Sequence, residues 1–132
     1  MKLPVTNTNA PVWRDITVRA ELPARLKPLE ELAKNLWWVW NSEGKNLFRD
    51  INPELWRSTG ENPVMLLQQI SAERLDEILA DEDMLARIDK VFNSFKEYMS
   101  VPMRTDIPSV SYFSMEYGLC NCLKIYSGGL GV

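Results

Sequence analysis

The strongest constraint on the fold is the spacing of apolar residues in the first hundred positions. From Leu29 to Trp40, apolar side chains recur every three or four residues, and the same spacing runs from Met84 to Met99. In an α-helix this spacing places the side chains on one face, which another element has to cover. The pattern therefore predicts a helical domain over residues 26–100.

The two apolar faces are predicted to pack together as the core of this domain. Trp37 and Trp40 lie on the first stripe, whereas Trp38 points about 100° away and is expected to be an exposed platform or docking contact. Tryptophan rings also stack on sugars, but large aromatics dominate buried interfaces, so an interface is the expected use of this ring. The side chains expected to be buried are Leu32, Leu36, Trp37, Trp40, Leu85, Ile88, Phe92 and Phe95.

Helix starts are marked by residues that cap N-termini. Four such positions occur between the two apolar stripes, and they are Asn52, Asn62, Ser71 and Asp81. The two asparagines are each followed by proline, which is favoured at the first helical position. With a helix that begins near Pro28 and a short one over residues 44–51, the sequence predicts about five helices.

Strand-like patterns lie at the two ends of the chain. Residues 12–20 alternate between apolar and polar side chains, which predicts an isolated strand within an N-terminal segment, residues 1–25. A linker over residues 101–108 contains two prolines, and a β-favouring run from Val110 to Met115 follows it. Residues 109–132 are therefore expected to begin a second, α/β domain.

A glycine-rich stretch follows this second strand. The chain reads Tyr-Phe-Ser-Met-Glu-Tyr-Gly over residues 112–118 and Ile-Tyr-Ser-Gly-Gly-Leu-Gly over residues 125–131. Glycines let the backbone approach a bulky anion, and the exposed N–H groups of such a loop can bind phosphate oxygens. A tight turn after the strand is the alternative. The spacing matches neither the dinucleotide fingerprint nor a Walker A loop.

These strings resemble the N-terminal region of bacterial and archaeal α-glucan phosphorylases, the glycogen and maltodextrin phosphorylase family. The similarity extends back through two tryptophan-containing segments, residues 32–41 and 47–56, and covers roughly residues 26–132. The resemblance implies a mainly α-helical N-terminal segment that leads into the first strand and glycine loop of an α/β Rossmann-like glycosyltransferase domain. It also implies that this domain is truncated here.

The resemblance implies a function as well, the phosphorolysis of α-1,4-glucan to glucose 1-phosphate. The family carries pyridoxal phosphate on a lysine of its C-terminal part, and no lysine of this chain lies in a matching context. The chain alone is therefore expected to be inactive and to contribute no catalytic, cofactor-binding or metal residue. The residues expected at the glucan and phosphate site are Glu116, Gly128, Gly129, Leu130 and Gly131. Glu116 has a simpler alternative, a solvated carboxylate at a strand end.

Two other functions are alternatives to this one. Nucleotide-sugar-dependent glycogen or starch synthases share the Gly-Gly-Leu-Gly loop, but favour a lysine two residues before the paired glycines. That position is Tyr126 here, and Lys124 lies two residues too early. The second alternative is a non-catalytic helical module that binds glucan or another protein.

Composition narrows the remaining classes. The net charge of −3 gives no electrostatic case for binding to nucleic acid or anionic membranes. We expect no signal peptide, and the sequence contains no apolar run of the length that a membrane span needs. A cytoplasmic location is expected, with α-1,4-glucan, phosphate, the rest of its own polypeptide and, in a homo-oligomer, another copy as partners. The absence of histidine excludes Ser-His and Cys-His chemistry. Cys120 and Cys122 are expected to be small, partly buried thiols.

Overall fold

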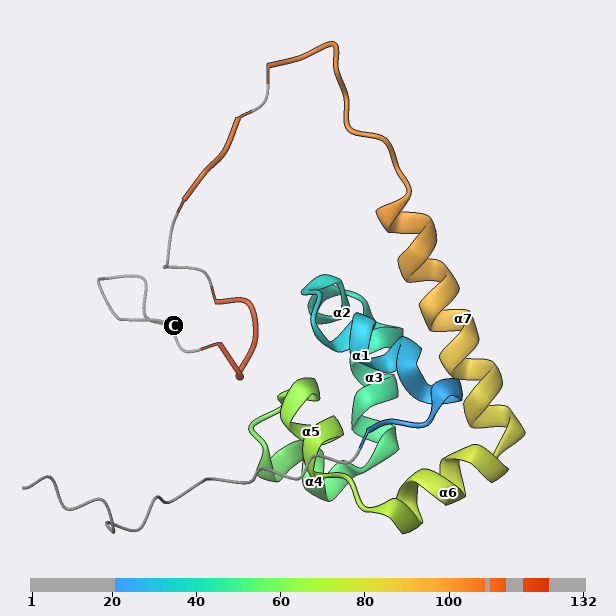
Figure 1. Ribbon diagram of the computed structural model, residues 1–132. Coiled ribbons are helices and arrows are strands. Elements are labelled where there is room, and N and C mark those ends of the chain that lie inside the picture. The colour runs from blue at the N-terminus through green and yellow to red at the C-terminus, as the bar shows by residue number, and fades with distance from the viewer. Residues whose placement is uncertain (1–20, 109, 114–117, 124–132) are drawn as a thin grey trace, which may run out of the picture.

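The computed structural model describes residues 21–108, 110–113 and 118–123. This part of the chain is mainly helical, as predicted, and contains no strand (Figure 1). It holds seven α-helices and one short 3-10 helix, more than the five or so expected. In chain order they are η1 (Ala24–Leu26), α1 (Lys27–Ala33), α2 (Trp37–Trp40), α3 (Ser42–Ile51), α4 (Pro53–Ser58), α5 (Pro63–Gln69), α6 (Ala72–Ala80) and α7 (Glu82–Met99).

The predicted N-caps are confirmed. Asn52 Oδ1 accepts a hydrogen bond of 3.0 Å from the Leu55 N–H at the start of α4, and the side chains of Asn62, Ser71 and Asp81 do the same for α5, α6 and α7. Each bond satisfies a backbone donor that has no partner inside the helix. A fifth cap, Asn41 at α3, was not predicted from the sequence.

The helix predicted from Pro28 to Trp40 is broken in two, and this break reverses two predictions about tryptophan. After α1 ends, Asn35 Oδ1 accepts a 2.9 Å hydrogen bond from the Trp37 N–H, and α2 begins there with a new phase. Trp38 is consequently only 2% exposed, whereas Trp40 is 61% exposed. The expected burial of Leu36 and Trp40, and the expected exposure of Trp38, were therefore wrong.

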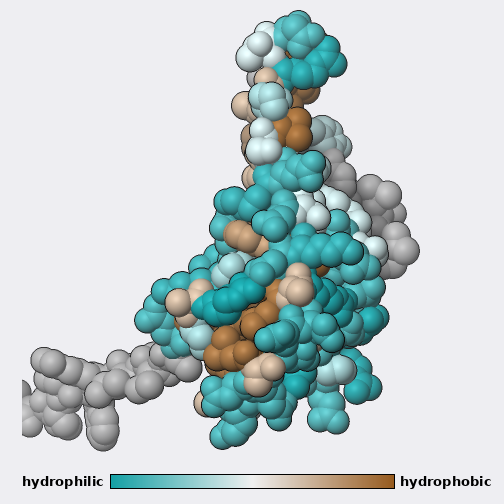
Figure 2. Space-filling view, turned by 90° about the vertical axis from the view of Figure 1, so that its right-hand side faces the viewer, coloured by the Kyte–Doolittle hydropathy of each residue, from teal (hydrophilic) through white to brown (hydrophobic). Residues whose placement is uncertain are grey.

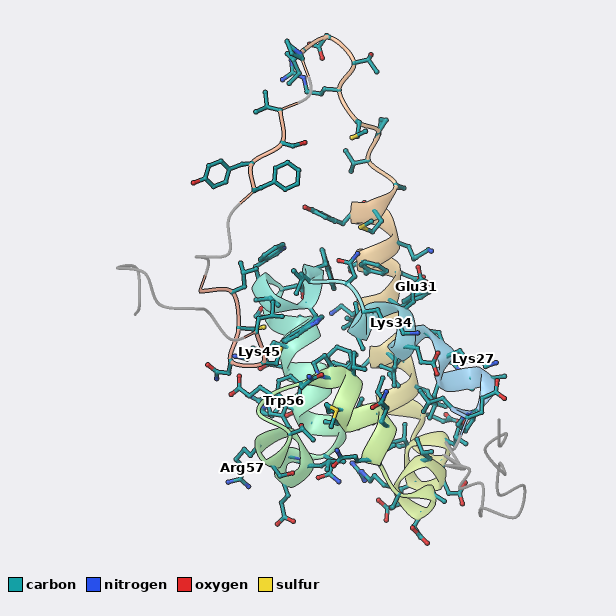
Figure 3. The ribbon with its side chains drawn as sticks, turned by 60° about the vertical axis from the view of Figure 1, so that its left-hand side comes forward. Lys27, Glu31, Lys34, Lys45, Trp56 and Arg57 are labelled. Carbon is teal, nitrogen blue, oxygen red and sulfur yellow. The ribbon has the colours of Figure 1, made fainter. Side chains whose placement is uncertain are left out.

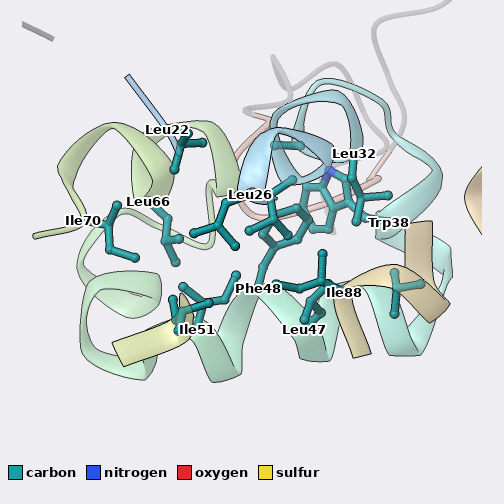
Figure 4. Close-up of a cluster of buried hydrophobic side chains, with 14 of the residues drawn as sticks. Leu22, Leu26, Leu32, Trp38, Leu47, Phe48, Ile51, Leu66, Ile70 and Ile88 are labelled. Atoms are coloured by element: carbon teal, nitrogen blue, oxygen red, sulfur yellow. The ribbon is translucent and has the colours of Figure 1, made fainter. Parts of the chain in front are cut away.

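The core lies between α1, α3, α5 and α7 (Figure 4). Its fully buried members include Leu26, Leu32, Leu47, Phe48, Ile51, Leu66 and Ile88. Burial is confirmed for Leu32, Trp37, Ile88 and Phe95, whereas Leu85 and Phe92 are only partly buried at its margin. Each fully buried aliphatic side chain contributes about 1.5–3 kcal/mol relative to leaving it exposed.

Aromatic rings form one end of this core. The rings of Phe48 and Trp56 are nearly parallel, with centroids 6.3 Å apart, and Trp38 meets both edge-on. On the α7 side, the Trp37 ring lies 5.6 Å from that of Phe95. Such ring pairs add about 0.5–1.5 kcal/mol each beyond their buried area. They fix α2 and α4 against α3 and α7.

Ion pairs attach α7 to the rest of the domain along its length. Arg87 Nη1 lies 2.9 Å from Asp50 Oδ2 on α3, and Lys96 Nζ lies 2.9 Å from Glu31 Oε1 on α1. Arg25 within η1 makes a two-pronged contact with Asp89. Exposed pairs of this kind contribute about 0–1 kcal/mol each, so packing remains the main source of stability.

Neither of the two strands predicted from the sequence is seen in the described residues. The expected strand over residues 12–20 lies outside the described residues, as do residues 114–115 of the second one. Its first part, residues 110–113, forms no strand. A strand is stabilised by hydrogen bonds to a neighbour, and no strand lies within the described residues to pair with it.

Candidate functional site

The site residues predicted from the sequence are Glu116, Gly128, Gly129, Leu130 and Gly131, and all five lie outside the described residues. The segment between them, residues 118–123, is described, and it lies against the helical domain. Cys120 and Cys122 pack against its hydrophobic core. The structure thus shows that part of the chain between Glu116 and Gly128 packs on the helical domain.

The two cysteines are free thiols in contact with each other. Their Sγ atoms lie 2.9 Å apart, and both side chains are partly buried, as predicted. Burial raises the pKa of the Cys122 thiol to about 12, and the hydrogen bond with Cys120 and the negative charge of Glu61 act in the same direction. Cys122 is therefore protonated near neutral pH, when it is a poor nucleophile and metal ligand.

Glu61, the carboxylate near these thiols, has a strained backbone. Its φ of 61° is left-handed, and it follows Gly60, whose φ is 67°. The Glu61 N–H donates a 2.9 Å hydrogen bond to the Trp56 carbonyl, which closes the end of α4. The buried Oε2 of Glu61 lies 3.0 Å from Lys45 Nζ, as an ion pair without the alignment of a hydrogen bond.

A groove of about 490 Å³ opens between α3 and α4 beside this pair. Its lining residues are Lys45, Asn46, Arg49, Pro53, Trp56, Arg57 and Glu61. Three cations and one carboxylate line this groove, but Lys45 is paired with Glu61 and Arg49 with Asp50. Figure 3 shows Lys45, Trp56 and Arg57 along one side of the molecule, away from Lys27 on α1.

This groove is not predicted from the sequence. The signal was present in part, because Lys45 and Arg49 are four residues apart and so lie on the same side of α3. Arg57 and Glu61 come from the next helix and the turn after it. Only the packing of α4 on α3 brings them to the same place.

Trp40 is the tryptophan in the described part of the chain whose ring is open to a ligand or to another protein. Trp37, Trp38 and Trp56 are all at most 5% exposed. Exposed apolar side chains lie at the same end of the domain, and we call Leu36, Trp40, Tyr98 and Met99 together the apolar end. A sugar-stacking role for the tryptophan cluster as a whole is thereby excluded, because three of its four rings are in the core.

No cluster of three metal-ligating side chains occurs among the described residues. Within the same residues, no helix combines the length and the apolar character that crossing a membrane requires.

Comparison with known proteins gives a family and several relatives. Residues 22–123 match the model of a family described as "Protein of unknown function (DUF3417)". The chain is 37% identical over 131 residues to glycogen phosphorylase of Mycobacterium tuberculosis (strain ATCC 25618 / H37Rv), a match that covers 90% of the chain and 15% of that protein. No solved structure matches significantly.

Two further relatives carry the same kind of name. Glycogen phosphorylase of Aquifex aeolicus is 43% identical over 106 residues, which cover 78% of this chain. Maltodextrin phosphorylase of Thermococcus litoralis is 39% identical over 122 residues, which cover 87% of it. In both cases the match covers 15% of the relative, so the chain spans only a small part of the length of these proteins.

Proposed function

We propose that this chain is the helical N-terminal domain of an α-glucan phosphorylase. The premise is that the chain belongs to the family described as "Protein of unknown function (DUF3417)", which is the N-terminal region of phosphorylases. The observation that supports this most strongly is the set of matches to glycogen and maltodextrin phosphorylases at 37–43% identity. The terminal glycine-rich string supports the same function.

The proposed reaction of the whole polypeptide is phosphorolysis. Orthophosphate attacks the terminal α-1,4-linked glucose of a glucan, the glycosidic bond breaks, and glucose 1-phosphate leaves with the glucan shortened by one unit. Pyridoxal phosphate, held outside this chain, would supply a phosphate group beside the attacking anion. Glycogen, starch or maltodextrin in the cytoplasm would be the substrate.

We assign the positioning of anions in this reaction to the glycine loop, Gly128–Gly131. A transition state with positive charge on the sugar and two anions nearby is stabilised by fixed dipoles, and backbone N–H groups supply these without adding net charge. Glu116 would lie at the carboxyl end of a strand, where α/β sheets present functional residues.

The helical domain supports this site through the segment that joins its two parts. Gly118 follows Glu116 by two positions, and Leu123 precedes Gly128 by five. Between them, Cys120 and Cys122 pack on the helical core. A segment fixed in this way reduces the freedom of the residues on either side. Positioning to within fractions of an ångström is worth orders of magnitude in rate.

The test is an assay of the full-length polypeptide with a maltooligosaccharide. We expect release of glucose 1-phosphate that depends on orthophosphate, and no elongation of the glucan when a nucleotide sugar replaces glucose 1-phosphate. Elongation from a nucleotide sugar would instead identify a synthase. Glucan binding without either reaction would identify a non-catalytic module, and both results would contradict the proposal.

A further inference from the structure

We infer that the apolar end of the helical domain, Leu36, Trp40, Tyr98 and Met99, is the surface by which this domain docks on the rest of its own polypeptide. The inference rests on the proposed function, because it names as partner the part that follows this chain in a full-length phosphorylase.

The four side chains form one surface because two helices meet there. Leu36 and Trp40 are one turn apart and so share a side of α2. Asn35 Nδ2 lies 3.7 Å from the Met99 Sδ, which brings the last turn of α7 to the turn before α2. Below this contact, the rings of Trp37 and Phe95 hold the same two helices together.

The exposure of this surface is unusual for the domain. Trp40 is 61% exposed and Met99 is 52% exposed, whereas the other tryptophans among the described residues are buried. Aromatic residues and methionine are enriched in the buried centres of protein interfaces, and tryptophan is among the commonest residues to carry their binding energy. The apolar end therefore has the composition of an interface centre that is uncovered in the chain alone.

The path of the chain identifies the partner. α7 ends at Met99, within the apolar end itself, and residues 101–108 then extend away above α2 (Figure 1). Residues 118–123 lie beside the helices again, across α2 from α7 in that view. The polypeptide is thus attached to the domain on two sides of α2, and Trp40 lies at the end of α2 itself.

This arrangement favours a segment of the same polypeptide over a separate molecule. The relatives are several times longer than the match, which covers 15% of each, and a tethered domain has an effective concentration of about millimolar. The extended residues also carry exposed apolar side chains, including Val101, Met103 and Ile107. Figure 2 shows hydrophobic atoms on this segment, above a face of the domain that is hydrophilic apart from a hydrophobic patch near its middle.

Two other occupants fit the surface less well. A sugar that stacks on Trp40 would need several hydrogen-bonding groups around the ring, whereas Leu36 and Met99 are apolar and the Asn35 amide is directed at Met99 Sδ. A second copy of the chain would bind without the tether. Both become outcomes of the test.

Hydroxyl-radical footprinting read by mass spectrometry tests the inference, because tryptophan, tyrosine and methionine all react. The rates at Trp40, Tyr98 and Met99 are compared between this chain and the full-length polypeptide. Met65 on α5, which is 39% exposed, is the internal control. We expect Trp40 and Met99 to react roughly fivefold more slowly in the full-length protein, as for residues moved to an interface centre, while Met65 keeps its rate.

A pair of variants tests the same docking surface by the rate of proteolysis. Trp40→Ser in the full-length protein should increase the rate of proteolysis in residues 101–108, whereas the matched change Met65→Ser should not. Equal footprinting rates in both proteins would overturn the inference. Protection that depends on protein concentration would identify a second copy, and protection that requires added glucan would identify a sugar site, and either would overturn it too. Phosphorolysis by the full-length protein is measured separately, so that the docking surface and the proposed function can fail independently.

Discussion

Gly44 on α3 lies directly against Trp38 on α2. A Cβ built on Gly44 would be 3.2 Å from both the Cα and the Cβ of Trp38, and 3.4 Å from the ring of Trp37. Contacts of this kind are tighter than ordinary van der Waals separation, and the atoms of Trp38 belong to the backbone or lie next to it. The absence of a side chain at Gly44 is what allows α3 to approach α2.

Gly44→Ala is therefore expected to destabilise the domain, although alanine is the better helix former. Alanine gains about 1 kcal/mol over glycine inside a helix, but overpacking against a rigid neighbour costs about 1–3 kcal/mol. We expect a net loss of about 1 kcal/mol in the free energy of unfolding, measured by urea denaturation. Increased stability of the variant would show that α2 can move away at no cost.

Trp38 and Trp40 should respond to truncation in opposite ways. Trp38→Ala removes a buried ring that touches Phe48 and Trp56, and should cost about 3–5 kcal/mol. Trp40→Ala removes an exposed ring and should change the stability of this chain by no more than about 0.5 kcal/mol. Urea denaturation of both variants measures the difference. A larger loss for Trp40→Ala would mean that the break between α1 and α2 is not formed in solution.

This pair also shows how far the sequence could predict the fold. The caps at Asn52, Asn62, Ser71 and Asp81 depend on neighbouring residues only, so local chemistry was sufficient to find them. The phase of α2 depends on one hydrogen bond from the Trp37 N–H to the Asn35 side chain. Apolar spacing continues across that turn without any change, and it could not reveal the break.

The candidate site could be predicted from the sequence only in part. The glycine loop and Glu116 were found from a resemblance, and they remain predictions because they lie outside the described residues. The groove at Lys45 and Arg57 was missed because its residues come from two helices and a turn. Spacing within one helix predicts which side chains share a face, but it does not predict which helices meet.

Acid should weaken the attachment of α7 to α3 through Asp50. Burial raises the pKa of Asp50, but hydrogen bonds from Arg49 and Arg87 outweigh it, so that the pKa is lowered overall. A carboxyl with a lowered pKa in the folded state stabilises that state above its unfolded pKa of about 3.9, and this contribution is lost as pH falls through the lower, folded value. Asp50→Asn should therefore lose less stability than the wild-type chain as the pH falls from about 5 to about 2, the range in which the Asp50 carboxyl titrates. An unchanged pH profile in thermal unfolding would argue against the contacts of Asp50 with Arg49 and Arg87.

Gly129→Ala tests the loop in the full-length polypeptide. If the backbone there approaches phosphate, an added Cβ should displace one N–H donor and reduce turnover about a hundredfold, which corresponds to about 3 kcal/mol. Melting temperature is measured on the same preparation as the control. Near-normal turnover with a lower melting temperature would show that Gly129 is a turn residue and not part of the phosphate site.

Cys122 should be slow to alkylate in the folded chain. Its pKa of about 12 means that only about one thiol in ten thousand is ionised at pH 8, whereas an ordinary cysteine with a pKa near 8.5 is about one quarter ionised. Because the thiolate is the reactive form, iodoacetamide should modify Cys122 at least about a hundredfold more slowly in the native chain than in urea.

Glu61→Gln tests how much the charge of Glu61 contributes to this slow reaction. Burial is the largest cause of the raised pKa, the hydrogen bond with Cys120 comes next, and the charge of Glu61 is the smallest. Removing that charge should therefore increase the native alkylation rate only slightly, by about threefold or less if the pKa falls by no more than half a unit. Mass spectrometry of the peptide that contains both cysteines, after fragmentation, assigns the modification to Cys122. A native rate within about tenfold of the rate in urea would mean that residues 118–123 do not stay on the helical core, because the thiol would then be as ionised as an ordinary one.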